Sequence, residues 1–168
     1  SMDRAKEALF SILGHDIIEA HVLDLFAGTG AVGIEALSRG AAHALFLDLN
    51  HQAIRIIRDN LEVTRLTDRA TVLQMDAFEL LRRSPREAYD FIYIAPPQYK
   101  GLWRQALEAL DANPDWLPEG VEVIVQIDPR EQENVQLTHL SAFDERRYGK
   151  TLLWFFCRSD ELEKEASS

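Results

Sequence analysis

Short apolar segments alternate with amphipathic segments along most of this chain. In the amphipathic segments the apolar residues recur every three or four positions, which is the spacing of one face of a helix. Most of the apolar segments show no alternation with polar residues, so they predict strands that are covered on both faces. The predicted helices lie at about residues 3–13, 31–38, 52–63, 77–83 and 101–110. The predicted strands lie at about residues 21–26, 43–48, 71–75, 90–94, 121–127, 136–143 and 152–157.

Strands and helices alternate from residue 21 to residue 127, which is the order that builds a parallel sheet with helices on both faces. The last two strands have no helix between them, and the loop at 144–150 predicts an antiparallel hairpin. We therefore expect a three-layer α/β/α, Rossmann-like fold with a mostly parallel, seven-stranded sheet. A length of 168 residues suits one domain, expected at residues 1–158 with the first helix included.

The chain is acidic, with 28 Asp and Glu against 18 Lys and Arg and a formal charge of −10. The segment 159–168 holds four acids and one lysine, has little apolar surface to bury and is expected to be a disordered tail. Since clustered cations drive phosphate binding, this charge argues against a protein that coats nucleic acid nonspecifically.

Other features of the composition exclude whole classes of protein. No run approaches the roughly 20 apolar residues that cross a bilayer, and the first residues lack the apolar core of a signal peptide, so we expect a cytoplasmic protein. The one cysteine, Cys157, excludes a disulfide framework, and its apolar neighbours predict a buried strand residue. No two of the five histidines have the spacing of metal ligands on a helix, which predicts no metal site.

The segment Gly28–Gly33 has glycines at its first, third and last positions, follows a predicted strand and opens a predicted helix. Glycines at such a turn let the backbone approach a ligand closely, and the helix start offers free N–H groups. A turn in which glycine only relieves backbone strain is the alternative. Asp48 favours a nucleotide site, because it ends the next strand, where a carboxylate accepts hydrogen bonds from both hydroxyls of an adenosine ribose.

Two classes of cofactor use this arrangement, and an acid before the glycines separates them. A dinucleotide places its pyrophosphate at the helix start, where the carboxylate of Asp24 would repel it. S-Adenosyl-L-methionine has no phosphate and carries an amino group and a sulfonium, which the carboxylate would attract. Asp76, just after the third strand, is placed for the adenine amino group, although any one of these acids alone would suit a helix cap. Acids at three successive strand ends together predict S-adenosyl-L-methionine.

A second loop, at residues 93–99, reads Tyr-Ile-Ala-Pro-Pro-Gln-Tyr and follows the fourth strand. Ligands collect outside the carboxyl ends of parallel strands, so this loop is expected to line the same crevice as the glycines. The alternative is that the two prolines only end a strand and begin a helix.

The run Asp-Leu-Phe-Ala-Gly-Thr-Gly-Ala-Val-Gly-Ile-Glu-Ala-Leu-Ser-Arg-Gly-Ala at 24–41 resembles the RsmD-type bacterial 16S rRNA guanine-N2 methyltransferases. Residues 3–13 and the segment Glu-Arg-Arg-Tyr-Gly-Lys-Thr at 145–151 resemble the same family, so the likeness covers residues 3 to about 158. It implies a class I methyltransferase fold, S-adenosyl-L-methionine as the donor, and the exocyclic amino group of a guanine in small-subunit rRNA as the acceptor.

The resemblance also implies roles for individual residues. Carbonyls of the loop after the fourth strand would hold the target amino group, and its aromatic residue would stack on the base. The expected catalytic residues are Ala95, Pro96, Pro97 and Tyr99. The expected cofactor-binding residues are Asp24, Phe26, Ala27, Gly28, Thr29, Gly30, Asp48, Leu49, Asp76 and Ala77. The expected partner is rRNA or an assembling small subunit, bound by a monomer, with no membrane and no metal.

The sequence departs from the family in two places. Members usually have Asp or Asn where this chain has Ala95, and their aromatic residue directly follows the prolines, whereas here Gln98 precedes Tyr99. Members also have a basic, strand-rich extension before the helix at 3–13. Two alternative functions therefore stay open. One is a cofactor-binding but catalytically impaired RNA-binding or assembly factor, and the other is a small-molecule or protein methyltransferase, which the acidic surface would suit.

Two basic clusters are candidates for contact with RNA phosphates. The arginines at 82, 83 and 86 are interpreted as a solvated loop surface. The cluster at 146–150 lies in the predicted hairpin loop and matches the family, so a phosphate contact and a solvated surface both remain open. The three tryptophans are expected in the core, and Trp103 is a second candidate for stacking on a base.

Overall fold

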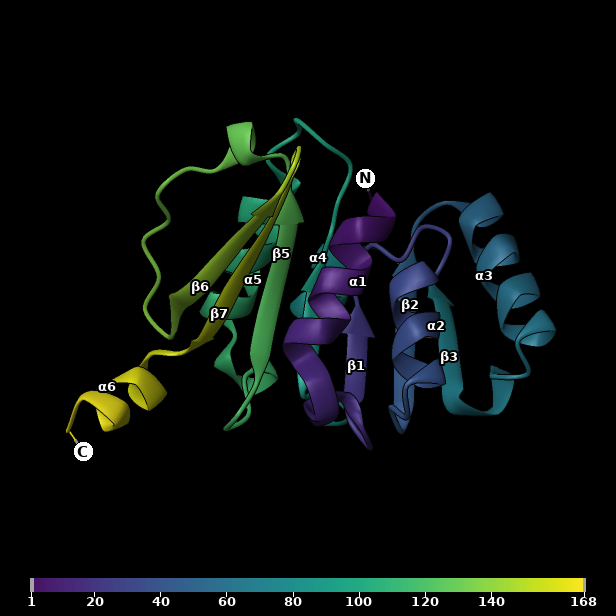
Figure 1. The fold of residues 1–168 in the computed structure, drawn as a ribbon, viewed down its shortest axis with the longest axis horizontal. Coiled ribbons are helices and arrows are strands. Elements are labelled where there is room, and N and C mark those ends of the chain that lie inside the picture. Colours follow the sequence, from purple (N-terminus) through teal and green to yellow (C-terminus); the bar gives the residue numbers. More distant parts are fainter. Residues whose placement is uncertain (1, 168) are drawn as a thin grey trace.

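The computed structural model describes residues 2–167 and contains a seven-stranded sheet with helices on both faces (Figure 1). The strands are β1 (His21–Asp24), β2 (His43–Asp48), β3 (Ala70–Gln74), β4 (Phe91–Ile94), β5 (Glu122–Ile127), β6 (Leu140–Tyr148) and β7 (Thr151–Arg158). The α-helices are α1 (Met2–Leu13), α2 (Ala31–Ser38), α3 (His51–Val63), α4 (Ala77–Leu81), α5 (Leu102–Ala112) and α6 (Ser159–Ser167). Short 3-10 helices lie at Gly14–Ile17, Thr67–Arg69, Pro114–Trp116 and Pro129–Glu131.

The strands lie in the order β3-β2-β1-β4-β5-β7-β6. Neighbouring strands from β3 through β5 run parallel, whereas β7 runs antiparallel to β5 and β6 antiparallel to β7. The predicted three-layer fold, with a mostly parallel sheet and an antiparallel hairpin at its end, is confirmed. Helices α3 and α5 are amphipathic and bury their apolar stripe against the sheet, whereas α2 is apolar over most of its length.

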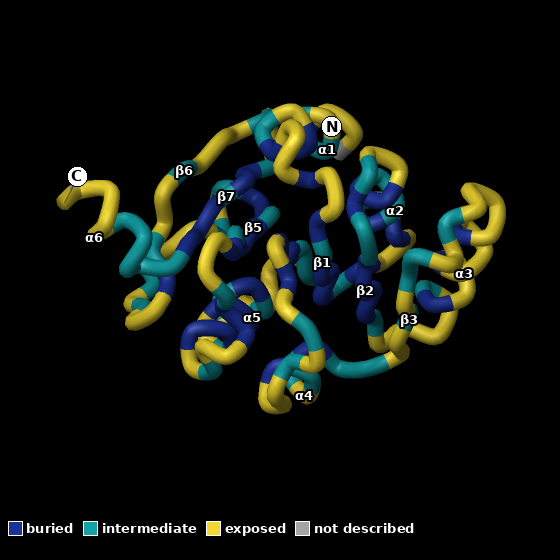
Figure 2. The backbone as a smooth tube through the Cα atoms, turned by 90° about the horizontal axis from the view of Figure 1, so that it is seen from below, coloured by how far each residue is buried: buried dark blue, intermediate teal, exposed yellow. Residues whose placement is uncertain are grey.

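Two apolar cores cover the two faces of the sheet. Phe10 of α1, Leu37 of α2 and Ile57 of α3 belong to one core, and Leu81 of α4 and Leu107 of α5 belong to the other. Figure 2 shows this separation, with α1 and α2 on one side of the buried strands and α4 and α5 on the opposite side. Because the central strands are covered on both faces, their ends and the loops beyond them are the parts available for ligands.

The hairpin is longer than the sequence predicts. β6 continues to Tyr148 and β7 starts at Thr151, so Gly149 and Lys150 alone separate the two strands, where a loop over 144–150 was expected. The predicted strand at 136–143 is displaced, because residues 136–139 precede β6. The charged residues 144–147 belong to β6 but are mostly exposed at the edge of the sheet, so no apolar pattern marks them as strand residues. A register shift between Ala142 and Asp144 further interrupts the alternation.

Residues 159–167 form helix α6, so the expectation of a disordered tail is wrong for them. Asp160 and Glu161 lie in its first turn, where acidic side chains favour a helix start. Arg158 pairs with Asp160, and the N–H of Gly120 donates to the carboxylate of Glu161. No residue of α6 is buried, so polar contacts near its start hold the helix. Amino-acid composition alone does not predict such contacts. Within residues 2–167, no helix is both long and apolar enough to cross a membrane.

The carboxyl ends of β1 to β5 meet at one edge of the sheet, called here the carboxyl edge, and their amino ends meet at the opposite, amino edge. Ile127 near the end of β5 pairs with Leu152 near the start of β7. The Gly149–Lys150 turn therefore also lies at the carboxyl edge, next to the end of β5 (Figure 1).

Candidate functional site

Glycine is needed at three positions in the glycine loop and the start of α2, for two different reasons. Gly28 and Gly30 have φ angles of +59° and +81°, in the left-handed region that residues with a side chain rarely adopt. A Cβ on Gly33 would lie 2.6 Å from the Cζ atom of Phe46, so only glycine lets α2 approach β2 this closely. The loop is thus held between the end of β1 and a tightly packed helix start.

Asp24 ends β1 directly before this loop and is 1% exposed. Its Oδ1 atom is buried without a hydrogen-bond partner among the described residues. Burial raises the pKa of Asp24 to about 7, against the lowering effect of the Phe26 backbone hydrogen bond, and the carboxylate of Asp48 raises it further. A buried carboxylate with an unpaired oxygen is incomplete without a cationic or N–H donor.

Asp48 ends β2 and faces the glycine loop. One carboxylate oxygen accepts the N–H of Gly28 at 2.9 Å, and the other accepts the N–H of Asn50 at 2.8 Å. Asp48 therefore connects the glycine loop to the loop after β2, and each oxygen keeps a second lone pair for a ligand hydroxyl. The next residue, Leu49, is 65% exposed, which places an apolar side chain beside the same loop.

Asp76 and Ala77 follow β3 at the same edge. The side chain of Asp76 caps α4 by accepting the N–H of Phe78 at 3.2 Å, so the capping role considered for this residue is present in the structure. Ala77 is buried as the first residue of α4. Asp76 and Leu49 line a cavity of about 1120 Å³ that extends along the exposed face of β3. Asp24 and Asp48 do not line this cavity, so the three predicted acids share an edge but not one enclosed pocket.

The remaining predicted residues of this half lie around the glycine loop. Phe26 is half-buried and packs edge-on against Phe78, with ring centroids 6.4 Å apart. Ala27 is buried and donates its N–H to the carbonyl of Leu47. Thr29 is exposed, and its carbonyl accepts a hydrogen bond from the side chain of Asn60 at 3.0 Å. These contacts fix the loop to β2 and α3.

The Pro-Pro loop follows β4 and lies at the same edge as the glycine loop, as predicted. Ala95 and Pro96 are half-buried, whereas Pro97 is exposed. Tyr99 is 58% exposed and has a φ angle of +62°, an unusual conformation for a bulky residue. The structure therefore presents an aromatic ring at the surface of the carboxyl edge, one residue later than the family pattern.

A network from the end of β5 holds Tyr99, and the sequence analysis missed it. The hydroxyl of Tyr99 donates to Asp128 at 2.6 Å, and the guanidinium of Arg130 donates to both at 2.7–2.9 Å. Glu131 accepts the backbone N–H of Tyr99 at 2.9 Å. Hydrogen bonds from Arg130, then from Tyr99, hold the pKa of Asp128 well below its usual range. Asp128 directly follows a strand, so the search for acids at strand ends that selected Asp24, Asp48 and Asp76 could also have found it.

The tryptophans and basic clusters occupy different places in the fold. Trp103 and Trp116 are buried, which confirms the prediction that they are core residues and removes Trp103 from the exposed surface. Cys157 is buried and free, as predicted for a strand residue. The cluster at 146–150 surrounds the hairpin turn at the carboxyl edge. The arginines at 82–86 lie between α4 and β4, on the path toward the amino edge.

The chain matches one known protein family over almost its whole length. A family model described as conserved hypothetical protein 95 matches residues 1–157. The chain belongs to this family. Its members include the RsmD-type methyltransferases, so the resemblance predicted from the sequence is confirmed.

Two curated relatives and one solved structure illustrate the family. "Putative rRNA methyltransferase YlbH" of Bacillus subtilis is 40% identical over 110 residues, which cover 64% of this chain and 58% of that protein. "Ribosomal RNA small subunit methyltransferase D" of Escherichia coli is 32% identical over 124 residues, covering 74% of this chain and 61% of that protein. The structure of "Putative methyltransferase yhhF" of Escherichia coli superposes with a TM-score of 0.83 at 27% identity, covering 92% of this chain and 85% of the other.

These similarities show the class I methyltransferase fold for this chain. The matched stretch spans about three fifths of the length of the two curated relatives. The shared part of the family includes the glycine loop and the ends of the first strands, since the family model matches residues 1–157.

Proposed function

We propose that this protein is an S-adenosyl-L-methionine-dependent rRNA methyltransferase that modifies the exocyclic N2 amino group of a guanine in small-subunit rRNA. The observation that carries the proposal is Asp24, a buried carboxylate with an unpaired oxygen at the mouth of a glycine loop. The family membership and the name of the Escherichia coli relative support the rRNA substrate. The whole catalytic unit is proposed to be one domain at residues 1–158, acting as a monomer.

The residues present fit this cofactor better than a phosphate-bearing one. An unpaired, buried carboxylate at Asp24 suits the amino group of the methionine moiety and repels a pyrophosphate. When bound, S-adenosyl-L-methionine supplies a methyl group on a sulfonium. Asp48 would accept hydrogen bonds from the ribose hydroxyls, and Leu49, Asp76 and Ala77 would border the adenine. The main chain at 26–30 would hold the methionine end, since the glycines permit close approach.

Positioning of the base is assigned to the Pro-Pro loop. The carbonyls of Ala95 and Pro96 would accept hydrogen bonds from the guanine amino group and direct its lone pair at the methyl carbon. Pro97 would keep the loop stiff, since its ring fixes φ. The exposed ring of Tyr99 would stack on the base, a contact worth ~1–3 kcal/mol. The methylated amine loses its extra proton readily, so the loop needs no strong base.

Contact with the rRNA backbone is assigned to the turn of the β6–β7 hairpin. Arg146, Arg147 and Lys150 surround Gly149 beside the end of β5. Their positive charge lies at the same edge as the Pro-Pro loop, so phosphates of a strand whose base enters the site could reach them. The overall charge of −10 is then compatible with RNA binding, because attraction is local.

The experiment is methyl transfer from labelled S-adenosyl-L-methionine to undermethylated small ribosomal subunits, with naked rRNA as a parallel substrate. We expect label in the subunit rRNA, recovered as N2-methylguanosine after digestion. Asp24→Asn should abolish incorporation, and Asp59→Asn, on the exposed face of α3, is the matched control. Label on another nucleoside would overturn the guanine assignment, and label on protein or small molecules alone would overturn the rRNA assignment.

Ala95 decides between an active enzyme and an impaired cofactor-binding factor. If the backbone carbonyls suffice, the wild type turns over, and Ala95→Asp leaves the single-turnover rate similar or raises it by adding an acceptor. If catalysis has been lost, the wild type is inert on every undermethylated substrate while still binding S-adenosylhomocysteine. In that case Ala95→Asp is the variant in which a rate should be sought first.

A further inference from the structure

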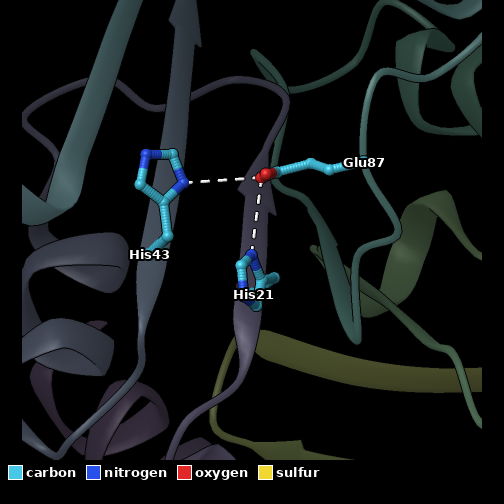
Figure 3. Close-up of side chains that lie close together, drawn as sticks. All are labelled: His21, His43 and Glu87. Atoms are coloured by element: carbon cyan, nitrogen blue, oxygen red, sulfur yellow. Dashed lines mark ion pairs between the residues drawn. The ribbon is translucent and has the colours of Figure 1, made fainter.

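Three side chains converge at the amino edge of the sheet, opposite the proposed cofactor site. His21 begins β1 and His43 begins β2, and the two residues are paired in register. Glu87 enters from the segment between α4 and β4 (Figure 3). Within residues 2–167 they form the one group of three or more potential metal ligands whose ligand atoms all lie within 4.8 Å of one another.

The facing atoms of this group are buried and lack hydrogen-bond partners. Nδ1 of His21 lies 3.6 Å from Oε1 of Glu87, and Nδ1 of His43 lies 3.5 Å from the same oxygen. None of these three atoms has a hydrogen-bond partner among the described residues, although each is shielded from solvent. Figure 3 shows both imidazoles turned toward the carboxylate. The two contacts are ion pairs when an imidazole is protonated, and without that charge the three polar atoms are costly unless a bound ion compensates them.

The separations match ligands around a shared ion better than direct hydrogen bonds. Ligands 2.0–2.2 Å from a tetrahedral zinc ion lie roughly 3.3–3.6 Å from one another. The separations between each imidazole Nδ1 and the Glu87 oxygen, 3.6 and 3.5 Å, lie in that range and are longer than a good N–H···O bond, and the two Nδ1 atoms lie within 4.8 Å of each other. A small inward movement of flexible side chains would bring all three atoms to bonding distance.

Neighbouring groups hold the ligands in the required form. Nε2 of His43 lies 3.0 Å from the hydroxyl oxygen of Thr71 on β3. A donated Nε2–H at this contact would leave Nδ1 deprotonated and free to bind a metal. His43 and Glu87 also line the cavity of about 1120 Å³, which offers an entry path and room for a water ligand.

We propose that His21, His43 and Glu87 bind a divalent transition-metal ion, with zinc as the best match, and that water completes the coordination. Two imidazoles and one carboxylate form a donor set that zinc accepts readily. The ion would join the first residues of β1 and β2 to the segment before β4, three parts of the chain separated by 22 and 44 positions. Its role is structural, since the six residues of β2 separate it from the carboxyl edge. The proposal does not rest on the proposed function.

The test is zinc binding to the full chain without an affinity tag, after removal of metal with a chelator. In competition with a chromophoric chelator, we expect one equivalent of tightly bound Zn²⁺. His21→Asn, His43→Asn and Glu87→Gln should each weaken binding about 100-fold or more. Thr71→Val should weaken it about 10-fold by releasing the His43 ring. His51→Asn is the matched control, because this exposed histidine follows the opposite end of β2.

Two further measurements keep the outcome clear if a variant folds poorly. Binding of S-adenosylhomocysteine at the other edge reports whether each variant is folded. Co²⁺ added to the wild type should give the visible absorption of a four-coordinate site, and Zn²⁺ should raise the midpoint of thermal unfolding by several degrees. Absence of stoichiometric Zn²⁺ binding to the wild type would overturn the proposal. Equal binding by folded His43→Asn or Glu87→Gln protein would overturn it as well.

Discussion

Asp24 and Asp128 are buried carboxylates at the same edge of one sheet, but their surroundings differ. They are 1% and 4% exposed; Asp24 is the last residue of β1, and Asp128 directly follows β5, two strands away in the sheet. Asp128 accepts hydrogen bonds from Arg130 and Tyr99, and these hold its pKa well below the usual range. Asp24 keeps one oxygen unpaired, and burial raises its pKa to about 7.

The two halves of the carboxyl edge therefore differ in whether they need a ligand to satisfy their buried carboxylate. The half around Asp128 is satisfied by its own side chains, so it holds Tyr99 in place before any substrate arrives. The half around Asp24 is satisfied only when a donor binds, and until then the fold bears the cost of burying a carboxylate oxygen without a partner. The completed network around Asp128 suits the positioning of Tyr99, whereas the incomplete one around Asp24 suits the binding of a cationic group.

The largest effect is expected from Asp24→Asn. Loss of the buried charge should weaken S-adenosylhomocysteine binding about 100-fold or more, since removing one partner of a buried pair costs ~3–5 kcal/mol. The cofactor-free variant should be more stable than the wild type at neutral pH. Calorimetry and thermal unfolding measure the two effects. Unchanged affinity with an unchanged melting midpoint would show that Asp24, like Asp128, does not depend on a bound ligand for a partner.

The pH dependence of the same two quantities sharpens this prediction. The folded pKa of Asp24 is raised from 3.8 to about 7, so the unfolding free energy of the cofactor-free wild type should fall as pH rises through that window, relative to Asp24→Asn. Affinity for S-adenosylhomocysteine should change in the opposite sense. It should fall about tenfold per pH unit below pH 7, because binding then requires loss of a proton. A flat affinity profile between pH 5 and 7 would contradict this assignment.

A smaller loss is expected from Asp48→Ala. The variant loses hydrogen bonds from a charged acceptor to the ribose and releases the N–H of Gly28, so binding should weaken by ~1.5–3 kcal/mol. Calorimetry with S-adenosylhomocysteine measures the loss, Asp59→Ala serves as the control, and NAD should not bind either protein. Tight binding of NAD without a response to S-adenosylhomocysteine would reverse the choice of cofactor.

The smallest effect is expected from Tyr99→Phe, which removes the hydroxyl but keeps the ring. The Asp128–Arg130 pair remains, so single-turnover methylation should fall by less than about threefold, whereas Tyr99→Ala should lose ~10–100-fold through stacking. Equal, large losses in both variants would show that the hydrogen-bond network matters more than the ring. Equal, small losses would assign stacking to another residue.

The sequence predicted those parts of the molecule in which a single physical requirement determines the residue type. The buried strands and the glycine loop follow from apolar runs and from backbone angles that glycine alone tolerates, so their positions were predicted within a few residues. The prediction placed this strand at 136–143, whereas β6 spans 140–148, because an exposed edge strand has no buried face to produce a pattern. Helix α6 depends on contacts of Arg158 and Glu161 that composition does not reveal.

Contacts between distant segments account for the rest. Asp128 and Tyr99 are 29 positions apart, and their hydrogen bond follows from the adjacency of β4 and β5. The prediction of no metal considered only spacing along a helix, whereas His21 and His43 face one another because their strands are paired. The roles assigned to the individual site residues remain predictions.

The absence of a side chain at Gly33 sets the distance between a helix and a sheet, and through it the position of the cofactor loop. Gly33 lies in the first turn of α2 and rests on Phe46, while Gly30 caps the same helix. One added methyl group at residue 33 would act as a wedge and tilt the helix start away from the sheet. The loop would move with it, although residue 33 need not touch the ligand. The distance between α2 and the sheet and the fit of the loop around a ligand are therefore coupled, so a change in the first also changes the second.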